Sequence, residues 1–129
     1  MTIRAFLKND AFANLLGIQL VEVCNGKAKT KLEIKDEHLN AVQIAHGGVI
    51  FSLADFTLAA AANSYGNIAV SIQASIHFLN VAKKGMIYAE AKEISRNHKL
   101  ATYEITVTSE NNELIATYQG MVYQKKENY

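Results

Sequence analysis

The sequence contains no proline and only one cysteine. A single cysteine, Cys24, cannot form a disulfide within the chain, which is typical of a reducing compartment and predicts a cytoplasmic location. The formal net charge of +1 excludes a general electrostatic attraction to nucleic acid or to anionic membranes, so neither is expected as a partner. The absence of proline fits a domain of compact elements joined by short turns.

The sequence also lacks the long apolar segments of membrane and secreted proteins. The first twelve residues have polar breaks from Lys8 to Asp10 and no continuous apolar core of a signal peptide. The longest apolar run, within Gly47 to Ser64, is shorter than the roughly 20 residues that a bilayer requires, and it contains Asp55. The length of 129 residues suits one domain over residues 1–129.

The apolar segment from Gly47 to Ser64 has one ionisable group, Asp55. It is rich in alanine and leucine, which favour helix, and its apolar residues surround nearly the whole helix circumference. It is therefore expected to be a buried helix that Gly66 ends as a left-handed cap. Burying a carboxylate without a nearby cation is costly, so Asp55 is predicted to be functional.

The rest of the chain reads as one N-terminal helix over Ile3–Leu16 and a series of strands. Asn25-Gly26 is the turn of a hairpin, and the tail Lys125–Tyr129 is expected to fray. Alternating apolar and polar residues predict strands over Ile18–Cys24, Lys27–Lys35, Val70–Phe78, Met86–Ile94, Ala101–Thr108 and Leu114–Gln124. About six strands and one apolar helix predict an α+β fold, in which a curved, mostly antiparallel sheet wraps the helix.

These segments resemble a known family. HGGVIFSLAD followed by NSYG, the strand AVSIQASIHFLNVAKKG, and the segments SRNHKLATYEITVT and ELIATYQGMVYQ are similar to hotdog-fold acyl-CoA thioesterases of the PaaI-like (phenylacetic acid degradation) branch. The resemblance implies a hydrolase that cleaves aryl- or medium-chain acyl-CoA thioesters and needs no cofactor, because CoA is part of the substrate. It also implies homodimers that often pair into homotetramers.

The resemblance also implies roles for individual residues. Asp55 matches the catalytic carboxylate, a general base on water or a nucleophile. Gly47 and Gly48 match the helix start whose N–H groups polarise the thioester carbonyl, with Gly48 as the catalytic donor. The remaining matched positions orient the carbonyl or the water, or lie near the site: Asn40, His46 and Ser71.

Physical chemistry adds a constraint to these roles. A helix start offers unpaired N–H donors and a partial positive charge, and glycine lets a ligand approach the backbone closely. Asp55 follows Gly48 by seven residues, which places the two about 10 Å apart along a helix. One carboxylate cannot reach a carbonyl held at its own helix start. Two helices paired antiparallel across a two-fold axis would bring Asp55 toward the partner's glycines, which predicts a homodimer with composite sites.

Other candidates have weaker support. Basic residues near turns, above all Arg96 and Lys99, are candidates for the CoA phosphates, although ordinary surface charge explains them equally well. Cys24 is interpreted as a packed residue, and the histidines lack metal-ligand spacing, so no metal is expected. Two alternatives stay open: a hotdog hydratase or dehydratase that uses His46, and a non-catalytic acyl-CoA-binding module.

Overall fold

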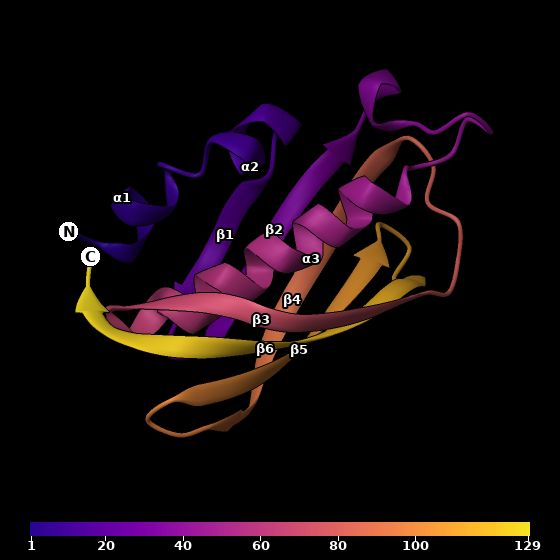
Figure 1. The fold of residues 1–129 in the computed structure, drawn as a ribbon. Coiled ribbons are helices and arrows are strands. Elements are labelled where there is room, and N and C mark those ends of the chain that lie inside the picture. Colours follow the sequence, from indigo (N-terminus) through magenta and orange to yellow (C-terminus); the bar gives the residue numbers. More distant parts are fainter.

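The computed structural model describes all of residues 1–129 as one sheet with a long helix across it (Figure 1). The helices are α1 (Ile3–Leu7), α2 (Ala11–Leu16) and α3 (Gly47–Ala62), with 3-10 turns at Asp36–His38 and Asn63–Tyr65. The strands are β1 (Gln19–Cys24), β2 (Lys27–Ile34), β3 (Asn67–Phe78), β4 (Gly85–Arg96), β5 (Leu100–Ser109) and β6 (Leu114–Asn128). None of the helices has the length and apolar content needed to cross a membrane.

The six strands form a single antiparallel sheet in the order β1-β2-β4-β5-β6-β3. The sheet curves around α3, which contacts every strand (Figure 1). The predicted α+β fold, with six antiparallel strands curved around one helix, is confirmed. The strand that follows α3 in the chain, β3, pairs only with β6. It therefore forms one edge of the sheet and leaves its outer backbone groups unpaired.

The core lies between α3 and the inner face of the sheet. Leu53, Ala54 and Leu58 are fully buried there. On β6, Gly120 gives Leu58 room, since a Cβ at this position would lie 2.7 Å from Leu58 Cδ2. Close contact with the sheet therefore explains why the helix is rich in alanine and why its neighbouring strand carries a glycine.

The sheet does not cover α3 completely. Gly48, Phe51, Asp55 and Ala59 recur every three or four residues and form a partly exposed stripe along the helix. The expectation of a fully buried helix is therefore corrected on this side: Asp55 is half-buried. Gly66 does end the segment as predicted, with φ of 98° after the short 3-10 turn.

Both ends of the chain differ from the prediction. The N-terminal segment forms two helices instead of one, because Asp10 begins α2 by accepting a 2.9 Å hydrogen bond from the Ala13 N–H. The tail is ordered: β6 pairs with β3 as far as Asn128. Tyr129 stacks on Phe6 with a ring-centroid distance of 4.2 Å, so the prediction of a frayed tail is wrong.

Candidate functional site

Asp55 lies in the middle of the uncovered stripe of α3, facing the edge of the sheet formed by β6 and β3. The hydroxyl of Tyr118 donates a hydrogen bond of 3.1 Å to Asp55 Oδ1. Partial burial raises the pKa of Asp55, because water no longer solvates the charge fully. Tyr118 and Ser71 lower that pKa in part, and the negative charge of Asp10 raises it further. The result is a carboxylate that is a stronger base than a free aspartate.

Tyr118 is a site residue that the sequence did not reveal. It is only 1 % exposed, on the inner face of β6, and its ring meets that of Phe51 edge-on at a centroid distance of 5.3 Å. Burial and the neighbouring Asp55 charge both raise the pKa of the Tyr118 hydroxyl, which keeps its proton. The only indication of Tyr118 in the sequence is that the strand pattern places it on the inner face, in line with Ala116 and Gly120. A tyrosine hydroxyl that is buried in this way needs a hydrogen-bond partner.

At the start of α3, the residues His46, Gly47 and Gly48 differ in their hydrogen bonds. His46 caps the helix, since its Nδ1 accepts a 2.8 Å hydrogen bond from the Gly48 N–H. The Gly48 N–H, which was predicted to polarise the substrate, therefore already has an acceptor. The N–H of Gly47 has no acceptor within the chain. Of the two glycines, Gly47 thus presents the free donor.

Asn40 and Gly47 line the same pocket, of about 270 Å³, at the N-terminal end of α3. Asn40 Oδ1 accepts hydrogen bonds from the N–H groups of Val42 (3.1 Å) and Ile44 (3.2 Å), which fixes the side chain. Its amide Nδ2 is left as a donor at this pocket. The other lining residues are mainly apolar: Ile44, Ala45, Ile50, Phe78, Leu79, Val81 and Ala82, with Asn80.

Asp55 does not line this pocket. It follows Gly47 by eight residues in the same helix, which separates them by about 12 Å along the axis. One chain therefore brings Asn40 and Gly47 together, and it brings Asp55, Ser71 and Tyr118 together, but it keeps the two groups apart.

Arg96 and Lys99 lie beyond the opposite, C-terminal end of α3. The Arg96 guanidinium stacks over the ring of Tyr65 at 3.6 Å from its centroid, and Nε donates to Gln124 Oε1 at 3.0 Å. Lys99, in the turn between β4 and β5, uses its backbone to bond Asn97 and Gln124. These two residues are thus not close to the Asn40–Gly47 pocket of their own chain.

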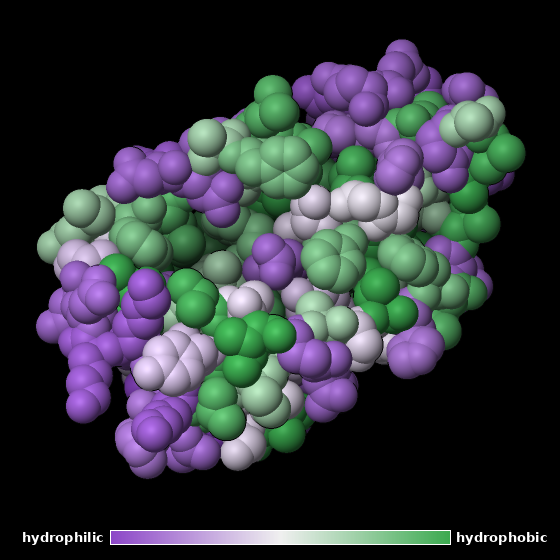
Figure 2. Space-filling model, in the orientation of Figure 1, coloured by the Kyte–Doolittle hydropathy of each residue, from purple (hydrophilic) through white to green (hydrophobic).

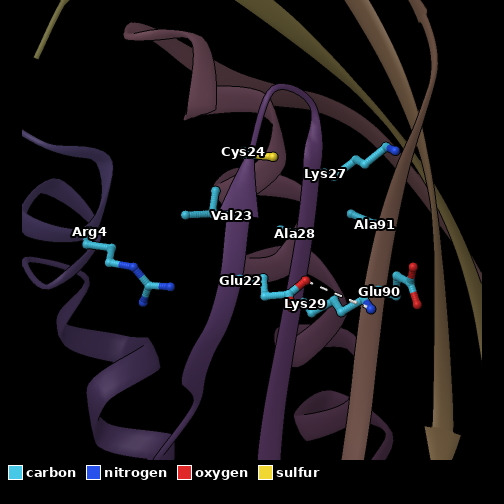
Figure 3. Close-up of a pocket in the computed structure, with 9 residues that line it drawn as sticks. All are labelled: Arg4, Glu22, Val23, Cys24, Lys27, Ala28, Lys29, Glu90 and Ala91. Carbon is cyan, nitrogen blue, oxygen red and sulfur yellow. Dashed lines mark ion pairs between the residues drawn. The ribbon is translucent and has the colours of Figure 1, made fainter.

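The largest hollow of the molecule is a different one, of about 510 Å³, over β1, β2 and β4 (Figure 3). It carries charges of both signs, including a 3.9 Å ion pair between Lys29 and Glu22, and Cys24 at its rim. None of the predicted site residues lines it. The structure brings together no three His, Cys, Asp or Glu side chains that could hold a metal ion.

The face that carries α3 and β3 is unusually apolar for a surface. Figure 2 shows hydrophobic side chains over much of this face, with polar groups between them. Exposed apolar residues of these elements and of the neighbouring α2 include Phe12, Leu15, Phe51, Ile72 and Phe78. Contiguous apolar surface of this kind marks a site for another molecule or another subunit.

Comparisons with known proteins agree with this geometry. A model of the thioesterase superfamily matches residues 43–116. The chain is 43% identical to a putative esterase of Archaeoglobus fulgidus over 123 residues, which cover 95% of this chain and 80% of the esterase. It is 32% identical to the acyl-coenzyme A thioesterase PaaI of Escherichia coli over 117 residues, covering 90% and 84%.

Two further matches extend the comparison. Human acyl-coenzyme A thioesterase 13 is 31% identical over 111 residues, which cover 83% of this chain and 79% of the human protein. The structure of the E. coli PaaI protein superposes with a TM-score of 0.94 at 30% identity, covering 97% of this chain and 91% of that one. The similarity thus spans nearly the whole domain, including both helix-borne parts of the site.

Proposed function

Because the chain belongs to the thioesterase superfamily, as a PaaI-like hotdog thioester hydrolase, we propose that it cleaves aryl- or medium-chain acyl-CoA to the free acid and CoA. Relatives that are named acyl-coenzyme A thioesterases support the choice of substrate. The observation that carries the proposal is the half-buried Asp55 carboxylate with its raised pKa, on a face with many exposed apolar side chains.

Asp55 is the general base of the proposed reaction. It takes a proton from a water molecule, and the hydroxide adds to the thioester carbonyl. The tetrahedral intermediate then collapses, the C–S bond breaks, and the departing CoA thiolate takes the proton that Asp55 removed from the water, which restores the Asp55 carboxylate. A raised pKa suits this role, because a base is most effective when its pKa approaches the working pH. Ser71, which interacts with Asp55, is placed to help orient the water.

The oxyanion is stabilised at the pocket shared by Gly47 and Asn40. The free Gly47 N–H at the positive end of α3 and the Asn40 Nδ2 amide are two donors for the developing negative charge. His46 supports this arrangement indirectly by capping the helix through the Gly48 N–H. In this assignment Gly47 replaces Gly48 as the donor, and Gly48 keeps the backbone close to the His46 ring.

The complete site forms between two subunits. The separation of about 12 Å between Gly47 and Asp55 is bridged when two α3 helices pair antiparallel, which brings Asp55 toward the partner's pocket. The unpaired β3 edge and its exposed Val70 and Ile72 support a dimer formed by continuing the sheet. Two such dimers then pair into a homotetramer.

The same pairing assigns a role to the basic residues. An antiparallel partner would place Arg96 and Lys99 beyond the N-terminal end of the other subunit's α3, at the outer side of its pocket. Arg96 uses Nε for Gln124 and keeps its two terminal nitrogens for a phosphate. We assign these two residues to the nucleotide end of CoA.

The decisive experiment is a thiol-release assay over a panel of aryl- and alkyl-CoA thioesters. Asp55→Ala is expected to lose at least about a hundredfold in turnover, as for loss of a general base, while the chain stays folded. Asp36→Ala removes an exposed carboxylate that pairs only with Lys84, and it should retain turnover. Near-normal turnover of Asp55→Ala would contradict the mechanism, and tight binding without thiol release would indicate a binding module.

Covalent catalysis is separated from the base mechanism by rapid quenching. If the carboxylate itself attacked, a mixed anhydride would form on Asp55, and mass spectrometry of the acid-quenched enzyme would detect the acyl group. The base mechanism predicts no such adduct.

Subunit mixing tests the composite site. Asp55→Ala and Asn40→Ala homodimers are both expected to be nearly inactive. After the two are unfolded together and refolded, a mixed dimer would contain one site with both defects and one intact site, so activity should recover. No recovery in verified mixed dimers, or full activity of a monomer in sedimentation, would refute the pairing.

A further inference from the structure

The ring of Tyr118 is held from several sides. Its strand neighbours across the sheet are Ile76 on β3 and Ile105 on β5, and the Phe51 ring packs against it edge-on. The residue is 1 % exposed, so the ring is closely packed on all sides. The position of its hydroxyl is thus fixed by the sheet, independently of any ligand.

The hydroxyl has one hydrogen-bond partner in the chain, Asp55 Oδ1 at 3.1 Å. An ionised carboxylate only accepts hydrogen bonds, so Tyr118 is the donor. Asp55 itself sits on the partly exposed stripe of α3, and its carboxylate accepts no hydrogen bond from a neighbouring turn of the helix. The bond from β6 to α3 therefore fixes the rotation of the carboxylate relative to the sheet.

We propose that Tyr118 is a positioning residue for thioester hydrolysis: its hydroxyl holds Oδ1 of Asp55, so that the carboxylate presents its second oxygen to the reacting water. This inference rests on the function proposed above and deepens it. Tyr118 does not touch the substrate in this role. It acts through Asp55: because the carboxylate is already oriented, the entropic cost of orienting it does not add to the activation barrier.

Three groups from three different elements influence the charge of the Asp55 carboxylate. Tyr118 on β6 and Ser71 on β3 stabilise its charged form, whereas Asp10 at the start of α2 repels it. Burial and the Asp10 charge raise the pKa of Asp55, and the hydrogen bond from Tyr118 opposes both effects. Removing the Tyr118 hydroxyl weakens this opposition. The pKa of Asp55 should then rise above its already raised value, which gives a readout that a loss of packing would not produce.

Tyr118→Phe tests the proposal because it removes the hydroxyl and keeps the ring. We expect kcat to fall about tenfold, as for loss of one hydrogen bond to a charged group, with KM nearly unchanged. The acid limb of the kcat/KM profile should move to higher pH. The matched control is Tyr103→Phe, because Tyr103 is another fully buried tyrosine that donates to a carboxylate, that of Glu93, at 2.9 Å. The control should keep the wild-type kcat and pH profile.

Two further measurements separate this inference from the proposed function. Carboxyl ¹³C NMR follows the titration of Asp55 without substrate, and its pKa should rise in Tyr118→Phe but not in Tyr103→Phe. In an Asp55→Ala background, Tyr118→Phe should cause no additional loss of the residual rate, because its effect passes through the carboxylate.

The outcomes are distinct. Thiol release by the wild type with unchanged kcat and unchanged Asp55 titration in Tyr118→Phe would overturn the role of Tyr118 and leave the function intact. An equal loss in Tyr103→Phe, or a further loss in the Asp55→Ala background, would also overturn it. If the wild type released no thiol while Tyr118→Phe still shifted the titration, the proposed function would fail and the hydrogen bond between Tyr118 and Asp55 would stand.

Discussion

Asp55→Asn is expected to inactivate the protein and to stabilise it at the same time. Asparagine has the shape of aspartate and keeps an oxygen that can accept the 3.1 Å hydrogen bond from Tyr118. The substitution therefore removes the charge and the basicity but little of the packing. Turnover should fall at least about a hundredfold, which corresponds to about 3 kcal/mol of lost transition-state stabilisation.

The gain in stability follows from the raised pKa of Asp55. Because burial raises the pKa of Asp55 in the folded protein above the ordinary aspartate value of 3.8, ionisation of Asp55 costs the folded state more than the unfolded chain. The wild type should thus lose stability as pH rises from about 4 through the folded pKa, whereas Asp55→Asn should not. The residue is only half-buried and keeps one hydrogen bond, so we expect a gain of about 1 kcal/mol at neutral pH, or about 4 °C in Tm.

Urea unfolding at a series of pH values measures the effect. The difference between Asp55→Asn and wild type should be absent below pH 3.8 and constant above the folded pKa. Asp36→Asn is the control of opposite sign, because Lys84 holds the pKa of that exposed carboxyl below its usual value. An Asp55→Asn protein that is less stable than wild type at neutral pH would refute the reasoning, as it would mean that the ionised carboxylate stabilises the fold.

Three more predictions concern the Asp55 carboxylate, the contact of Gly120 with Leu58, and the stacking of Tyr129 on Phe6. The kcat/KM of the wild type should fall on the acid side at a higher pH than a free aspartate would give, because burial raises the pKa of Asp55, and a limb centred at or below 3.8 would contradict this. Gly120→Ala should lower the free energy of unfolding by about 2 kcal/mol in urea titrations, because its Cβ would lie 2.7 Å from Leu58 Cδ2. Tyr129→Ala should cost about 1 to 2 kcal/mol by thermal or urea unfolding, because it removes the stacking on Phe6, and no change would show that the tail contributes nothing.

The elements that were predicted correctly are specified by short sequence motifs within the elements themselves. The turn at Asn25-Gly26 has positive φ at both residues, 37° and 81°, as its sequence indicates. The start of α3 coincides with the Gly47-Gly48 pair, and Gly66 ends the 3-10 turn that follows the helix. Each of these features depends on a few consecutive residues, so a single sequence is enough to locate them.

Of the two errors in the fold, one concerns a local helix cap and the other a segment that depends on distant contacts. Polar residues from Lys8 to Asp10 interrupt the N-terminal segment, but whether they break the helix depends on the cap that Asp10 makes. The tail Lys125–Tyr129 is expected to fray from the sequence, yet pairing with β3 and stacking of Tyr129 on Phe6 hold it in place. The break between α1 and α2 is thus a local cap, whereas in the tail tertiary contacts overrode a weak local propensity.

The site shows the same division. Asp55 could be proposed as a candidate from sequence, because a single charge in an apolar helix is conspicuous. Its partner Tyr118 is 63 residues away and belongs to an ordinary alternating strand, so only the curvature of the sheet reveals the contact. The choice between Gly47 and Gly48 also needed the structure, because it depends on the direction of the His46 ring.

The geometry of α3 explains why one helix carries two parts of the site that do not meet. Its first turn supplies a donor at Gly47, where the helix dipole is strongest, and its middle supplies Asp55, where the sheet provides Tyr118 and Ser71 to hold a base. A base placed on the first turn would be paired with that dipole, and its pKa would fall. Separating the two along the helix keeps the donor electropositive and the base strong, and in the proposed antiparallel dimer each helix completes the site of the other.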